Sequence, residues 1–108
     1  MSEYVAIFMT AGSEEEAQKV ARTLVEKRLV ACCQLLPGMR SFYWWKGEIC
    51  ADDEVLLIAK TRRNLFDAVV EAVRSIHSYE VPEIVAMPIA DGFDAYVRWL
   101  DENVTSST

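Results

Sequence analysis

His77 is the only histidine of the chain, so any imidazole base or histidine ligand must use it. Glu80 and Glu83 follow it by three and six residues. Neutral imidazole and carboxylate oxygen both bind divalent metal ions, which makes His77 a candidate metal ligand. The structural alternative is that His77, just past a predicted helix, caps the helix C-terminus and interacts with its dipole. The spacing alone favours this alternative, because copper normally recruits more nitrogen or sulfur than one histidine offers.

Lys60 and Glu83 are charged residues at the edges of apolar stretches. In extended chain, Lys60 shares a face with Leu56 and Ile58, and Glu83 shares a face with Val85. Burying a charge alone is costly, so each is expected to have a partner. The sequence favours a structural ion pair over a role in ligand binding, and each of the two residues is a candidate partner for the other.

Cys32, Cys33 and Cys50 make an odd cysteine count and have no CxxC spacing. Neither a disulfide framework nor a thiolate zinc site is indicated. A catalytic cysteine needs an activating base, and only His77 is available. We therefore expect small buried hydrophobic residues, with Cys50, near a predicted turn, as the most reactive thiol.

Four consecutive aromatic residues, Phe42 to Trp45, occupy a predicted strand. Strand alternation sends Tyr43 and Trp45 to one face and Phe42 and Trp44 to the other. Aromatic side chains dominate packing and association energetics, so both pairs are candidates for an interface core. Trp44 fits that role best, and Trp45 is also a candidate to line a cleft.

These residues depend on one long predicted β-hairpin, Val30–Thr61, around which the chain is organised. Its first strand is interrupted at Pro37-Gly38, and Lys46-Gly47 provides the tight turn, where glycine allows a positive φ. Both faces of the return strand are apolar, as in Val55–Ala59, so both need cover. Helices of the same chain can cover one face. The other predicts oligomerisation through the sheet.

The flanking segments predict three helices and two further strands. Ser13 followed by Glu16 is a capping box, and Asn64 with Asp67 resembles a second N-cap. The expected elements are a strand Glu3–Thr10, a helix Ser13–Arg28, a helix from Asn64 to Ile76, a connector His77–Glu83, a strand Ile84–Ala90 and a helix Phe93–Val104. This βαββαβ order with an extra C-terminal helix predicts an α+β, ferredoxin-like fold. Residues 1–104 form a single domain and 105–108 a flexible polar tail.

Composition limits the partners. The chain has 108 residues and a formal net charge of −6, whereas nucleic-acid-binding domains usually carry a basic stripe. No run of 18 apolar residues is present, so no membrane partner is expected. With free thiols and no targeting segment, the cytoplasm is the expected compartment.

Five separated segments are distinctive in order and spacing: Leu29–Cys32, Pro37-Gly38, Ser41–Gly47, Lys60-Thr61 and His77–Glu83. Together they resemble the divalent-cation-tolerance protein CutA family, over almost the whole chain from Glu3 to about Asn103. The resemblance implies a ferredoxin-like fold and a tight homotrimer whose subunits resemble PII signalling proteins. It also implies a role in tolerance of copper and other divalent metals.

The resemblance also implies a polar cleft between subunits. The matching positions are Trp45, Lys60, His77, Tyr79, Glu80 and Glu83. Such a cleft suits a small anion or metabolite held by Lys60, with His77 as the metal-contacting residue. Ser78 stands where proline is common in the family, which is expected to loosen the connector.

The function predicted is that of a non-enzymatic trimeric protein of copper tolerance or response, which binds a divalent metal weakly and has no obligatory cofactor. The alternative is a PII-like signalling protein that binds a small anion or metabolite in the cleft between subunits. An acylphosphatase-like enzyme needs an arginine in the loop after the first strand, and Ala11-Gly12-Ser13 has none. An RNA-binding sheet needs aromatics on central strands amid basic residues, unlike this cluster near a hairpin tip.

Overall fold

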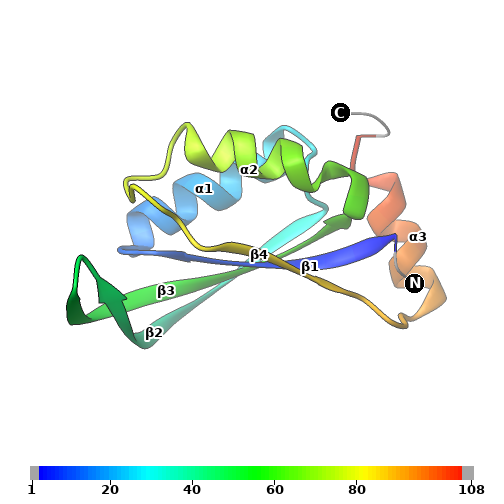
Figure 1. Ribbon diagram of the computed structural model, residues 1–108. Helices are drawn as coiled ribbons and strands as arrows, with labels where there is room; N and C mark the ends of the chain where they lie inside the picture. Colours follow the sequence, from blue (N-terminus) through cyan, green and yellow to red (C-terminus); the bar gives the residue numbers. More distant parts are fainter. Residues whose placement is uncertain (1–2, 106–108) are drawn as a thin grey trace.

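The computed structural model describes residues 3–105, which form a four-stranded antiparallel sheet and three α-helices (Figure 1). In chain order the elements are β1 (Tyr4–Ala11), α1 (Glu14–Glu26), β2 (Cys32–Trp45), β3 (Glu48–Arg62), a 3-10 turn (Arg63–Leu65), α2 (Phe66–Arg74), β4 (Ile84–Pro88) and α3 (Asp94–Glu102). The sheet order is β2-β3-β1-β4. The predicted α+β class and order of elements are confirmed. The last strand ends at Pro88, two residues before the predicted end at Ala90.

The main core lies between the sheet and helices α1 and α2, which cover the same face (Figure 1). Alternate residues of the two central strands point into it, and most of them are fully buried. These are Val5, Ile7 and Met9 from β1 and Val55, Leu57 and Ala59 from β3. They pack on Val20 and Leu24 of α1 and Val69 and Val73 of α2.

Of the two predicted helix N-caps, the one at Ser13 is confirmed and the one at Asn64 is not. Ser13 caps α1, because its Oγ accepts from the Glu16 N–H at 3.1 Å. The reciprocal half of the capping box is absent from the described contacts, since the Glu16 carboxylate binds Ser78 instead. The cap predicted at Asn64 is wrong: a 3-10 turn precedes α2, and Leu65 at its N-cap makes no side-chain hydrogen bond to the helix.

The hairpin closes at Lys46-Gly47, where φ is 51° and 82°. Two successive positive φ values are typical of the type I′ turn that suits strand twist. Pro37-Gly38 leaves β2 continuous but shifts its register between Leu36 and Met39. β3 pairs with β1 only from Val55 onward. Between Val55 and the hairpin turn, β3 pairs with β2 alone. The resulting two-stranded extension, residues 39–54, is called the arm.

The second face of the sheet is largely open. It carries Cys32, Gln34 and Leu36 of β2, Leu56, Ile58 and Lys60 of β3, Ala6 and Phe8 of β1, and Val85 and Met87 of β4. We call this set the open face. Leu36 and Met87 are 61% and 56% exposed. The expectation that two helices cover one face is confirmed, while α3 covers one end of the second face, where the Tyr96 hydroxyl lies 3.5 Å from Cys32 Sγ.

Helix α3 covers one end of the sheet, away from the hairpin turn (Figure 1). Leu100 and Val104 pack on Tyr4 in a small second core. Asp101 holds this contact, since it accepts from the Tyr4 hydroxyl at 2.6 Å and pairs with Arg62. Of the predicted flexible tail, Thr105 donates its N–H to the Arg28 carbonyl at 2.8 Å, and residues 106–108 lie outside the described part of the chain.

Candidate functional site

His77 is almost completely enclosed, with 2% of its side chain exposed. Its Nε2 lies 2.7 Å from the Thr10 carbonyl oxygen, and its Nδ1 accepts from the Tyr79 N–H at 3.1 Å. A carbonyl can only accept, so Nε2 carries the proton and the ring is neutral. The imidazole thus reaches the end of β1. His77 caps the C-terminus of α2 through its backbone N–H, which bonds the Val73 carbonyl at 2.8 Å, while its ring binds Thr10 and Tyr79 instead of the helix end.

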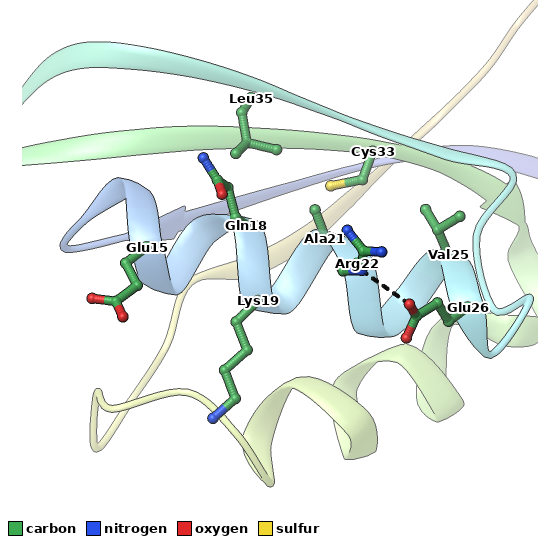
Figure 2. A pocket seen from close by; sticks show the side chains of 9 residues that line it. All are labelled: Glu15, Gln18, Lys19, Ala21, Arg22, Val25, Glu26, Cys33 and Leu35. Carbon is green, nitrogen blue, oxygen red and sulfur yellow. Dashed lines mark hydrogen bonds and ion pairs between the residues drawn. The ribbon is translucent and has the colours of Figure 1, made fainter.

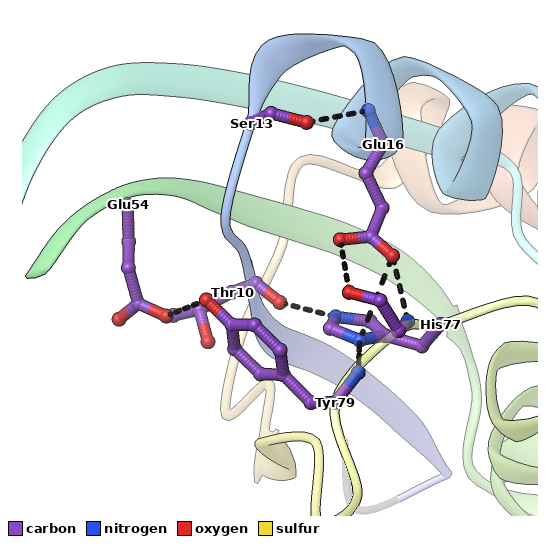
Figure 3. A network of polar contacts seen from close by, with 7 residues as sticks. Thr10, Ser13, Glu16, Glu54, His77 and Tyr79 are labelled. Carbon is purple, nitrogen blue, oxygen red and sulfur yellow. Dashed lines mark hydrogen bonds and ion pairs between the residues drawn. The ribbon is translucent and has the colours of Figure 1, made fainter.

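Glu16 fastens the segment after His77 to the first turn of α1 (Figure 3). Its carboxylate accepts from the Ser78 N–H at 2.7 Å and from the Ser78 hydroxyl at 3.0 Å. One carboxylate oxygen also lies 4.0 Å from Nδ1 of His77. Proline has no N–H to donate, so the bond from the Ser78 N–H holds the connector in a way that proline cannot, which argues against the expected loosening.

Tyr79 lies against His77 and extends to the arm (Figure 3). The two rings meet edge to face, with centroids 4.7 Å apart. The Tyr79 hydroxyl donates to the Glu54 carboxylate at 2.8 Å, and Gly12 gives it room: a Cβ at that position would lie 3.0 Å from the hydroxyl. Burial, and then the bond to Glu54, raise the pKa of Tyr79 above its usual 10.0.

The other predicted site residues lie apart from this network within one chain. Lys60 stands on the open face and donates to the Gln34 side chain. It does not pair with Glu83, so the predicted ion pair is not formed among the described residues. Trp45 is at the end of the arm and 38% exposed. Glu80 and Glu83 are both exposed.

Only two of the six predicted cleft residues therefore come together, His77 and Tyr79. Sequence reasoning missed the partners Thr10, Glu16 and Glu54. Thr10 contributes a backbone carbonyl, which no residue type can reveal. The sequence gives one signal for Glu54, which is the last acidic residue before the apolar run Val55–Ala59; in the structure its side chain is buried.

The arrangement within one chain does not fit a preformed metal centre. Across residues 3–105, no three His, Cys, Asp or Glu side chains are grouped so as to hold an ion. The Nδ1 lone pair of His77 is already engaged by Tyr79. The cysteines are free thiols, and burial raises the pKa of Cys33 to about 12, which keeps that thiol protonated.

A shallow groove of about 690 Å³ lies elsewhere, between α1 and the edge strand β2 (Figure 2). Its floor is apolar, with Cys33 and Leu35 from β2 and Val25 from α1. The rim is polar and includes the ion pair of Arg22 with Glu26 at 3.0 Å. It contains none of the predicted site residues.

Comparison with known proteins gives the family. The profile of the family described as CutA1 divalent ion tolerance protein matches residues 5–103. The chain belongs to the CutA1 family. A divalent-cation tolerance protein CutA from Thermus thermophilus is 47% identical over 97 residues, which is 90% of this chain and 94% of that protein. Mouse Protein CutA is 46% identical over 102 residues, 94% of this chain but 57% of its own length. The chain thus spans little more than half of the mouse relative.

Solved CutA1 structures share the fold. The structure of the Thermus thermophilus protein has a TM-score of 0.92 at 45% identity and covers 94% of this chain and 99% of its own. The structure from Oryza sativa has a TM-score of 0.94 at 37% identity and covers 97% and 96%. Among CutA relatives, the rice protein is named chloroplastic and the Archaeoglobus fulgidus structure is titled periplasmic. Within the described residues of this chain, no helix has the length and apolar character to cross a membrane.

Proposed function

We propose that this protein acts in divalent-cation tolerance as a non-enzymatic cytoplasmic homotrimer that binds copper or another divalent metal weakly. The observation that carries the proposal is the family match over residues 5–103, together with 47% identity to a divalent-cation tolerance protein of nearly the same length.

Assembly is supported by the apolar surface that a single chain leaves uncovered. The open face presents Leu36, Val85 and Met87, and the arm adds Phe42 and Trp44, each 71% exposed. Contiguous apolar patches of this kind are unusual on monomers and mark interaction surfaces. Copies of the chain in cyclic symmetry can cover the open face and the arm together.

Metal binding at His77 has to compete with contacts already made. An ion that takes the Nδ1 lone pair must displace the Tyr79 N–H, which lies 3.1 Å away. Glu16 is the nearest carboxylate, 4.0 Å from that nitrogen. One engaged nitrogen and one carboxylate support weak binding, and further ligands have to come from a neighbouring subunit or from water.

The anion-binding alternative has less support. The charged groups near His77 are the carboxylates Glu16 and Glu54, which repel an anion. Lys60, the residue expected to hold it, lies on the open face beside Gln34. We therefore propose cation tolerance rather than anion signalling.

Native mass spectrometry with and without added copper(II) tests both parts. The expected result is a species of three times the 12.3 kDa chain that takes up about one ion per subunit. Competition with a weak chelator then measures the affinity of the protein for copper(II). A 12.3 kDa monomer overturns the assembly proposal, and a trimer that takes up no more copper than a His77→Ala variant overturns the metal proposal.

A further inference from the structure

We propose that Tyr79 and Glu54 couple the connector, His77–Glu83, to the root of the arm, so that displacing the connector releases the arm. The hydroxyl of Tyr79 donates to the Glu54 carboxylate at 2.8 Å. This bond joins two segments that are 25 residues apart in the chain and belong to different parts of the fold. The coupling goes beyond cation tolerance, because it concerns how one segment of the subunit controls another.

Glu54 occupies the position where the arm leaves the four-stranded sheet. The next residue, Val55, is the first of β3 to pair with β1. Glu54 itself pairs only with Met39 of β2, beside the register shift that follows Leu36. A bulge bends a strand and weakens its ladder locally. The root of the arm is therefore the point at which the two-stranded extension can hinge. Among the described residues, Glu54 makes the one side-chain hydrogen bond between the arm and the rest of the subunit.

The hydrogen bond between Tyr79 and Glu54 is shielded from solvent and supported by neighbouring residues. Glu54 is 8% exposed, and a buried carboxylate without a hydrogen bond is costly. The absence of a Cβ on Gly12 lets the Tyr79 hydroxyl approach, and the His77 ring packs edge to face on the tyrosine ring. Hydrogen bonds to charged groups are also stronger than those between neutral groups.

The connector in turn is held by contacts that have nothing to do with the arm. Ser78 donates its N–H and its hydroxyl to Glu16 of α1, and His77 lies 2.7 Å from the Thr10 carbonyl (Figure 3). A ligand or partner that pulls the connector away from α1 moves Tyr79 with it. The Glu54 carboxylate then loses its donor, and the arm is free to hinge at the bulge.

Hydrogen exchange in the full chain tests this coupling at the arm root, residues 39–41 and 52–54. Tyr79→Phe removes the hydroxyl and keeps the ring. Glu16→Ala removes the carboxylate that holds Ser78 of the connector, without touching Glu54 or the arm. Each is expected to speed arm-root exchange by roughly tenfold or more, relative to the amides of β1 in the same sample. Glu15→Ala is the matched control, because it removes an exposed carboxylate from the same helical turn.

The double variant Glu16→Ala with Tyr79→Phe decides whether the two contacts act in series. The coupling predicts no further acceleration beyond Tyr79→Phe alone. Arm-root exchange that stays at the wild-type rate in Tyr79→Phe, or in Glu16→Ala, overturns the proposal, as does an equal effect of Glu15→Ala. The coupling is a property of one subunit and does not rest on the proposed function. Native masses of the same samples report the oligomer separately, so a monomeric protein refutes the trimer without deciding the coupling.

Discussion

Trp44 offers the sharpest test of whether the arm belongs to an interface. Its side chain lies on the arm and is 71% exposed in a single chain. Truncation to alanine should therefore leave the fold of one subunit nearly unaffected, since substitutions at exposed positions usually change stability by no more than about 0.5 kcal/mol. Any large effect must come from a surface that covers the ring.

The size of that effect follows from area. A tryptophan side chain buries roughly 150–250 Å² when fully covered. The 71% that is still exposed corresponds, at about 25 cal/mol per Å², to roughly 3–4 kcal/mol per subunit if assembly covers it completely. Three subunits lose this together, so the protein concentration at which half the trimer dissociates should rise by at least about a hundredfold.

Sedimentation equilibrium over a range of protein concentrations measures this midpoint, with circular dichroism to confirm an intact subunit. Val25→Ala is the control, since Val25 is 41% exposed but lies on α1, beside the groove of Figure 2 and away from the arm and open face. A Trp44→Ala trimer that dissociates at the wild-type midpoint refutes the argument that the arm is interfacial.

Four further outcomes are expected. Gly12→Ala should lower the free energy of unfolding by roughly 1 kcal/mol or more in denaturant titrations, because the new Cβ lies 3.0 Å from the Tyr79 hydroxyl. His77→Ala should abolish specific copper uptake in titration calorimetry while the trimer persists; unchanged heats remove the residue from the site. The raised pKa of Tyr79 means that the unfolded tyrosine ionises at a lower pH than the folded one. The free energy of unfolding should therefore fall as pH rises above 10.0, and Tyr79→Phe should flatten that decline. Cys50 should react with iodoacetamide at pH 8 well before Cys33, whose pKa burial raises to about 12; equal rates contradict the burial argument.

Much of the fold could be predicted because local signals and global pattern agree. The unbroken apolar run at Val55–Ala59 indicated a strand that needs cover on both faces; the core covers one face of β3, and cover of the other stays a prediction. Gly47 indicated a tight turn, and Ser13 marked the start of α1. Asn64 misled because a cap motif is a local preference, and here the chain enters α2 through a 3-10 turn that buries Leu65.

The candidate site was predicted less well, for a physical reason. Periodicity places a residue on a face, but it does not say which distant backbone atoms meet it. The sequence singled out His77, yet its partners are a strand carbonyl at Thr10 and a helix carboxylate at Glu16, both more than 60 positions away. Glu16 was assigned to a capping box because that is the nearest use for it, and tertiary contact with Ser78 prevailed. The six-residue cleft requires more than one subunit, so a single chain leaves it untested.

The place of β1 in the sheet has a consequence for synthesis on the ribosome. β1 precedes the other described strands in the chain, but its neighbours in the sheet are β3 and β4, and Met9 pairs with Leu57 and Ile84. At translation rates of roughly 5–20 residues per second, the β4 partner emerges about 4–15 s after β1. The β2–β3 hairpin joins neighbouring segments and can close much earlier. Until β3 has emerged, the nascent chain carries β1 as an unpaired apolar strand, the kind of exposed segment that favours aggregation during folding.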